Sequence, residues 1–213
     1  MATLHQIVIQ RNEDLIRRFH EDRLPPHAAL MNLKDAPQNH ALGGGEIKPL
    51  PGALGPKIWE KGTKHETSLW VPKTYSNYRE AFFKFIKHLY GNDVDMAGAK
   101  AYDVDHLFNR ERASAGAMIR VEAVSASVNR SHGAGYEKTA GASTVAISRQ
   151  AKMRPFTKID FISVLKILGL PAPASAADKP RIDVIKQHSQ KLGFTPDQIE
   201  TGINNLLEIA KRR

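Results

Sequence analysis

The sequence places an aspartate next to a histidine, at Asp105 and His106, and an asparagine further along at Asn129. Mg²⁺ prefers oxygen ligands and keeps several of its waters, so one carboxylate and one amide oxygen from a protein can hold it. A neutral imidazole can take a proton from an attacking water near pH 7. We therefore interpret Asp105 and Asn129 as candidate ligands of Mg²⁺ or Mn²⁺, and His106 as the candidate catalytic base of phosphodiester hydrolysis.

The segment Ala101–His132 must position these side chains. It contains two β-rich runs separated by a charged loop, and a small-residue stretch follows them. Neighbouring residues of a strand point to opposite faces. If Asp105 faces a helix that bears Asn129, a cation can sit between hairpin and helix while His106 projects toward the substrate. Asp103 shares the face of Asp105, so we interpret it as a supporting acid behind the ligands.

Two further side chains follow the asparagine. Arg130 is placed to hold a phosphate, and His132 is a candidate substrate contact. Each residue alone has a simpler structural interpretation: a partly buried, hydrogen-bonded histidine for His106, a helix cap for Asn129 and a surface charge for Arg130. The combination of residue types in this order favours a nuclease.

These residues carry a resemblance to a known family. The run YDVDH, which begins at Tyr102, and the run VNR around Asn129 resemble the HNH, or ββα-metal, endonuclease superfamily. The closest variant is the Asp-His-Asn form of RNA-guided CRISPR effectors and of phage endonuclease seven. The resemblance covers about Lys100–Lys138 and implies a ββα fold, one divalent metal and cleavage of DNA strands.

The resemblance also assigns roles to individual residues. It implies that Asp105 and Asn129 are metal ligands and that His106 is the general base. The family often has zinc-binding cysteine pairs around this unit, and the chain has no cysteine. In the full-histidine form of the motif, the last histidine lies further beyond the asparagine position than His132 does.

Composition limits the class of protein. The net charge of +9 favours a polyanionic partner, either nucleic acid or an acidic membrane surface. The resemblance implies that the partner is DNA, with RNA as the alternative. The lack of cysteine excludes disulfides, thiolate zinc sites and a cysteine nucleophile. We find no apolar run as long as a membrane span, and acids and arginines interrupt the apolar N-terminal run. We therefore expect no membrane partner, and either a cytoplasmic location or export without a cleavable signal peptide.

Apolar periodicity and turn residues predict most elements outside the motif. Trp59 and Trp70 are interpreted mainly as core anchors, with base stacking as the alternative. Asn77 and Glu80 predict a capping box for one helix, and Thr195 with Gln198 predicts another. The predicted helices are Leu4–Arg23, Tyr75–Tyr90, Lys158–Leu168, Ile182–Leu192 and the C-terminal run from Pro196, and Ala140–Arg149 is predicted as a short strand.

These predictions give an α+β chain in which a small ββα-metal hairpin-helix core is embedded in mostly α-helical surroundings. Residues 1–56 would form an N-terminal helix and an irregular Pro/Gly-rich linker or surface loop. Residues 57–150 would form the HNH-like nuclease core, with the motif at 101–138, and residues 151–213 a C-terminal helical bundle.

The predicted function is a metal-dependent DNA endonuclease. Within that class the chain is either an antibacterial toxin or effector, whose partner would be an immunity protein, or a phage or mobile-element nuclease. The alternatives are a non-catalytic nucleic-acid-binding module and a protein-interaction adaptor. The binding module would use the basic C-terminal residues Lys186, Lys191, Lys211, Arg212 and Arg213.

Overall fold

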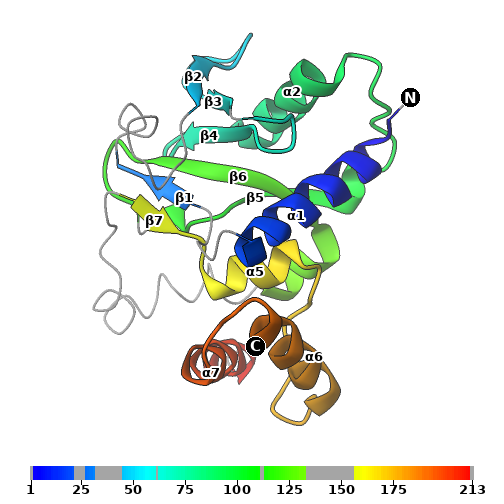
Figure 1. Ribbon diagram of the computed structural model, residues 1–213, viewed down its shortest axis with the longest axis vertical. Coiled ribbons are helices and arrows are strands. Elements are labelled where there is room, and N and C mark those ends of the chain that lie inside the picture. Colours follow the sequence, from blue (N-terminus) through cyan, green and yellow to red (C-terminus); the bar gives the residue numbers. More distant parts are fainter. Residues whose placement is uncertain are drawn as a thin grey trace.

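The computed structural model describes residues 2–21, 27–31, 45–60, 62–110, 113–132 and 156–211. Within these residues, seven strands form one antiparallel sheet, with helices packed around it (Figure 1). The elements in chain order are α1 (Leu4–Glu21), β1 (His27–Leu30), β2 (Glu46–Pro49), β3 (Lys57–Glu60), β4 (Ser68–Pro72), α2 (Tyr78–Tyr90), the 3₁₀ helix η3 (Ala99–Ala101), β5 (Tyr102–His106), β6 (Met118–Ser125), a helix at residues 126–132, β7 (Phe156–Lys158), α5 (Phe161–Ile167), α6 (Lys179–Lys191) and α7 (Pro196–Lys211).

The long strand β6 is the centre of the sheet, whose order is β2-β3-β4-β6-β1-β7 with β5 also paired to β6. Val121 of β6 pairs with Leu69 of β4 and with His106 of β5, so these two strands lie on opposite sides of β6. Ile119 pairs with β4 and with β1, which places β1 on the same side as β5. The six central residues of β6 are buried, so this strand holds the hairpin in the middle of the fold.

The prediction of mostly α-helical surroundings is wrong, because five strands besides β5 and β6 belong to the sheet. Two of them, β1 and β2, lie where a linker or surface loop was expected. Each has four residues, which is too short for the alternation of apolar and polar residues to show. Pro49 ends β2 on an edge strand, where the missing N–H of a proline is tolerated. Strands from all three predicted segments therefore share one sheet.

The two sides of β5 meet different surroundings. Tyr102 and Val104 join a core cluster with apolar side chains of α1 and α2, including Phe82 and Phe85. Asp103 and Asp105 alternate with these residues and point to the opposite side of the strand. That side carries α5 and the 126–132 helix, so the hairpin has one apolar face and one face with charged residues.

Several local predictions can be compared with the structure. The capping box of α7 is confirmed: the Thr195 backbone N–H donates to Gln198 Oε1 at 2.9 Å, and the Gln198 backbone N–H donates to Thr195 Oγ1 at 3.3 Å. Asn77 is the N-cap residue of α2, as predicted, but the capping box itself is wrong, because the Asn77 side chain makes no cap hydrogen bond. The tryptophan rings of Trp59 and Trp70, whose centroids are 6.0 Å apart, are buried in the sheet as core anchors.

The strand predicted at Ala140–Arg149 falls outside the described residues.

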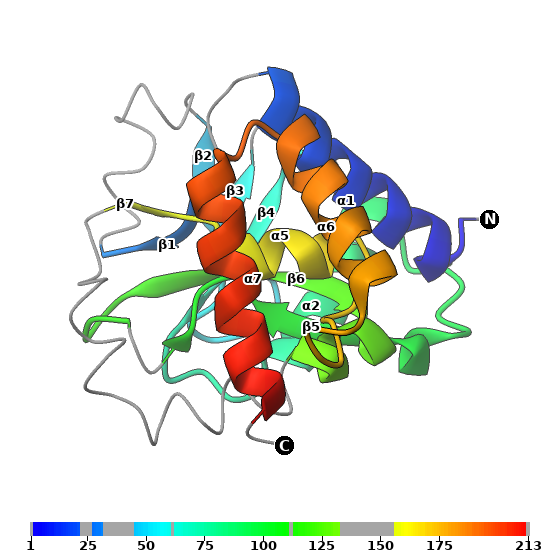
Figure 2. The same cartoon turned by 90° about the horizontal axis from the view of Figure 1, so that it is seen from below.

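The C-terminal helices form a unit below the sheet. Helices α6 and α7 lie side by side, and α5 stands between them and the sheet (Figures 1 and 2). Asp160 caps α5 by accepting a hydrogen bond from the Ser163 N–H at 2.8 Å, so α5 starts there rather than at Lys158. Among the described residues, no helix is long and apolar enough to cross a membrane.

Candidate active site

The candidate site is built on the β5–β6 hairpin. The two strands pair from Tyr102 with Ser125 to His106 with Val121, and helical residues 126–132 follow β6 without a break. The start of β5 is fixed by Arg79 of α2, whose guanidinium donates to the Tyr102 carbonyl at 2.7 Å and to the Ala99 carbonyl at 2.9 Å. Arg79 was not among the site residues predicted from the sequence. A hairpin tied to a helix in this way gives its side chains fixed positions.

Asn129 and Asp103 meet between the hairpin and the 126–132 helix. Asn129 Nδ2 donates to Asp103 Oδ2 at 3.3 Å. An ionised carboxylate only accepts hydrogen bonds, so this contact fixes which end of the amide is nitrogen. Asn129 Oδ1 is buried and has no hydrogen-bond partner among the described residues. A buried acceptor left in this state costs free energy, and a carbonyl oxygen is a ligand that Mg²⁺ and Mn²⁺ accept. The position of Asn129 therefore fits a cation ligand.

Asp105 lies on the same face of β5 as Asp103, two residues further along. Within the described residues it forms an ion pair with a lysine and has no hydrogen bond to the Asn129 amide. Lys166 Nζ of α5 stands 2.7 Å from Asp105 Oδ2, and the two side chains are 9% and 10% exposed. In the structure Asp105 contacts Lys166, and Asn129 contacts Asp103. Lys166 was missed, although a lysine between Leu165 and Ile167 in an apolar helix is a sequence signal for a buried partner.

His106 ends β5 on the apolar side. Its ring meets the Tyr78 ring of α2 edge-on, with centroids 4.3 Å apart, and its Nε2 is buried without a hydrogen-bond partner in the described part of the chain. Burial lowers the pKa of His106 to about 4, opposed by the charge of Asp105 and reinforced by that of Arg110. The imidazole is therefore neutral at pH 7, which is the protonation state that a base requires.

The two residues predicted to contact substrate differ in exposure. The Arg130 side chain is 73% exposed, and its Nε lies 4.0 Å from Asp103 Oδ2. His132 is only 1% exposed, and its Nε2 is 2.7 Å from the Leu170 carbonyl oxygen. A substrate contact does not fit this histidine, because it joins the 126–132 helix to the turn after α5.

A scan against protein-family models found no match for this chain, and searches of curated proteins and of solved structures also returned none. Within the described residues, no three side chains of His, Cys, Asp or Glu are grouped so as to hold a metal ion. The predicted ligands Asp105 and Asn129 are one carboxylate and one amide, so they do not make a group of that kind.

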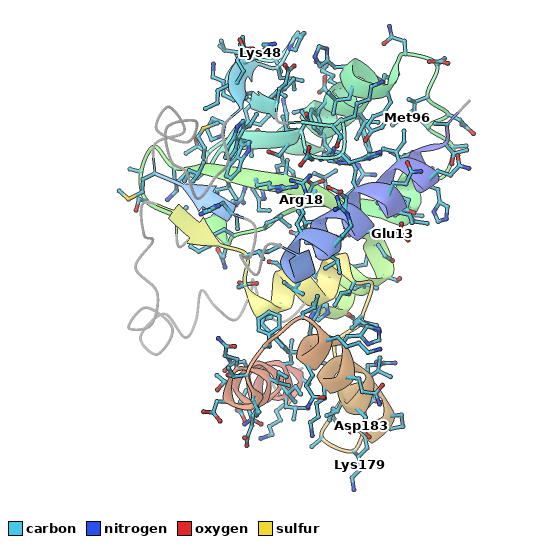
Figure 3. The ribbon with its side chains drawn as sticks, viewed as in Figure 1. Glu13, Arg18, Lys48, Met96, Lys179 and Asp183 are labelled. Carbon is cyan, nitrogen blue, oxygen red and sulfur yellow. The ribbon has the colours of Figure 1, made fainter. Side chains whose placement is uncertain are left out.

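A cavity of about 630 Å³ lies next to the ion pair, between α1 and α5. Lys166 lines it together with Glu13 and Asn12 of α1 and with Tyr102 and Ser125 of the hairpin. Glu13 is labelled on α1 in Figure 3, and α5 passes below that helix. Lys166 is therefore close to two environments, the Asp105 carboxylate and an open space with polar groups.

A second buried network holds β6 itself. Arg11 of α1 donates to Glu122 from Nη2 at 3.0 Å and also to the Thr67 carbonyl, and Arg120 Nη2 lies 2.7 Å from the same carboxylate. Burial alone would raise the pKa of Glu122, but Arg11 and Arg120 hold it below its usual value. Glu122 pairs with Asp105 across the hairpin, so this network keeps the site strand in register.

Proposed function

We propose that this protein is an endonuclease that hydrolyses DNA phosphodiester bonds with one divalent cation. The observation that carries the proposal is the hydrogen bond from Asn129 to Asp103, which leaves a buried amide oxygen on the strand face that also bears Asp105. An amide oxygen without a hydrogen-bond partner among the described residues, beside the Asp103 carboxylate on a hairpin followed directly by a helix, has the donor chemistry of a magnesium site.

Three side chains have separate roles in this proposal. Asp105 and Asn129 hold the cation through oxygen, and Asp103 orients the asparagine by accepting its Nδ2–H. Carboxylates that hydrogen-bond a metal ligand commonly fix its orientation and raise the affinity of the site. When bound, the cation supplies positive charge to the phosphate oxygens and to the leaving oxygen.

His106 supplies the base. It takes a proton from the attacking water at Nε2, the ring nitrogen that no described group engages. A base with a pKa of about 4 is weak, but the negative charge of a bound phosphodiester opposes the effect of burial and raises the pKa toward the working pH. The Tyr78 ring fixes the orientation of the imidazole.

The nucleic acid is attracted by the net charge of +9 and held by exposed cations such as Arg130. These contacts are to phosphates, which DNA and RNA share, and the preference for DNA comes from the family that the motif resembles. The cell role follows the same resemblance: a toxin or effector with an immunity protein, or a phage or mobile-element nuclease. Toxicity on expression that His106→Ala abolishes and a neighbouring immunity gene relieves would favour the toxin.

Plasmid nicking in Mg²⁺ or Mn²⁺ tests the activity. We expect His106→Ala to lower the nicking rate by about 10²- to 10⁴-fold, the usual contribution of a general base. His88→Ala is the matched control, since His88 is an exposed histidine near the end of α2 and should leave the rate unchanged. Equal nicking by wild type and His106→Ala would remove the proposal.

A second candidate is a nucleic-acid-binding or adaptor protein without catalysis. The Asp105–Lys166 ion pair favours it, because an internal cation already neutralises the carboxylate. Salt-sensitive DNA binding that needs no metal, with no nicking under any metal condition, would support the binding module. Failure to bind nucleic acid at low salt would support the adaptor.

A further inference from the structure

The Asp105–Lys166 pair is the buried ion pair that joins the hairpin to α5. Its Nζ–Oδ2 distance is 2.7 Å, and the two residues are 61 positions apart in sequence. Taking both charges out of water is costly, and removing either partner leaves an uncompensated charge that costs more. A cation close to the Asp105 carboxylate therefore stabilises the folded protein when that carboxylate is ionised.

We infer that Lys166 and a divalent cation are alternative occupants of Asp105, so that Lys166 closes the site until a cation replaces it. This inference rests on the proposed function for the identity of the ligand. Lys166 cannot stay against Asp105 when a doubly charged ion binds there, because the ammonium and the ion repel each other at contact distance.

The unsatisfied oxygen of Asn129 supports two states of the site. With Lys166 on Asp105, Asn129 Oδ1 remains buried without a partner among the described residues. A state in which a cation contacts both Asp105 and Asn129 satisfies that oxygen and neutralises the carboxylate together. The lysine state therefore has a cost that cation binding removes.

The neighbouring cavity can accommodate the Lys166 ammonium when it leaves Asp105. Lys166 already lines this space of about 630 Å³, which also contains Glu13 and Ser125. Lysine has a flexible four-carbon stem and a compact ammonium, so the group can turn from Asp105 into the cavity without moving the backbone. The Glu13 carboxylate and the Ser125 hydroxyl supply acceptors there.

Mn²⁺ binding to the full chain, measured by calorimetry, tests the inference without DNA. Lys166→Met removes the competing ammonium and keeps the stem, so we expect the Kd for Mn²⁺ to fall about tenfold or more. Lys191→Met removes an exposed lysine of α6 and should leave the Kd unchanged. In Lys166→Met/Asp105→Asn the gain should disappear. An unchanged Kd in Lys166→Met, or a gain that survives Asp105→Asn, would overturn the inference.

A measurement on the wild-type chain covers the case in which Lys166→Met fails to fold. The ammonium of a buried, ion-paired lysine can be followed by ¹⁵N NMR. We expect saturating Mg²⁺ to shift or broaden the Lys166 signal and to leave that of Lys191 in place. An unmoved Lys166 signal at saturation would overturn the inference. Because neither measurement uses DNA, tight competition without nicking would reject the nuclease alone.

Discussion

At the scale of single residues, the site depends on which atoms lack a partner. Asn129 Oδ1 and His106 Nε2 are both buried and unbonded within the described residues. Buried polar atoms are usually satisfied, and an exception calls for an explanation such as a catalytic role or a bound ion. Asp103 fixes the asparagine and Tyr78 packs on the histidine, so each free atom is held in one orientation.

The lowered pKa of His106 predicts acid sensitivity. The pKa is about 4 in the folded chain and 6.5 in an exposed histidine. Between these values the unfolded state binds more protons, so stability falls as the pH drops from 6.5 toward 4, by up to about 3 kcal/mol. We expect urea unfolding at pH 7 and pH 4.5 to show a smaller difference in His106→Gln than in wild type.

The exposed His88 is again the control for this titration. His88→Gln makes the same substitution at an exposed histidine of α2 and should keep the pH dependence of wild type. Carboxylates also titrate in the acid range, but they are common to all three proteins, and the comparison isolates His106. An identical loss of stability in wild type and His106→Gln would show that the histidine is not held neutral by folding.

At the scale of elements, the sequence predicted the parts of the site with long or strongly patterned segments. The strands bearing Asp105 and Val121 and the C-terminal helices had clear apolar periods. The four-residue strands β1 and β2 did not. Strand β1 is buried through pairing with the distant strands β6 and β7, and β2 is a partly exposed edge strand paired with β3. The position of Lys166 between Leu165 and Ile167 was a local signal of burial, but local pattern does not reveal that its partner is Asp105, 61 positions away in the sequence.

The buried arginine network predicts a large effect of a small change at Glu122. Glu122→Gln keeps the shape of the side chain but leaves Arg11 and Arg120 without their shared anion. Breaking a buried ion pair in this way costs about 3–5 kcal/mol. We expect denaturant unfolding to show a loss of that order, and Glu80→Gln, which breaks an exposed pair with Lys84, to have a much smaller effect.

The pH dependence of this network has a known sign. The pKa of Glu122 is held below its usual value, so its contribution is present at neutral pH and is lost as the pH falls through the folded pKa. Glu122→Gln should therefore lose less stability on acidification than wild type. A variant as stable as wild type at pH 7 would show that the network does not hold β6.

At the scale of the whole molecule, α5 connects the sheet to the C-terminal helices. It carries Lys166 toward the hairpin, and its Phe161 packs against α7 and against Phe194. Gly202 of α7 lies so close to the Phe161 ring that an added Cβ would clash with it. The packing of α7 against α5 therefore helps to fix the position of α5, the helix that carries Lys166.

Gly202→Ala tests this connection. An alanine normally favours a helix over glycine by about 1 kcal/mol, but here the methyl group must displace the Phe161 ring, and overpacking costs about 1–3 kcal/mol. We expect a lower Tm in Gly202→Ala and an unchanged or slightly higher Tm in Asn204→Ala, an exposed position on the same helix. A higher Tm in Gly202→Ala would contradict the close packing of α7 on α5.

The location of Mn²⁺ in crystals soaked with the ion tests the central claim most directly. Anomalous scattering identifies the ion without reference to activity. We expect one peak within about 2.5 Å of Asn129 Oδ1 and of an Asp105 carboxylate oxygen, with Asp103 still bonded to the asparagine amide. Saturating Mn²⁺ with no peak at the hairpin, or with peaks only at surface carboxylates, would contradict it.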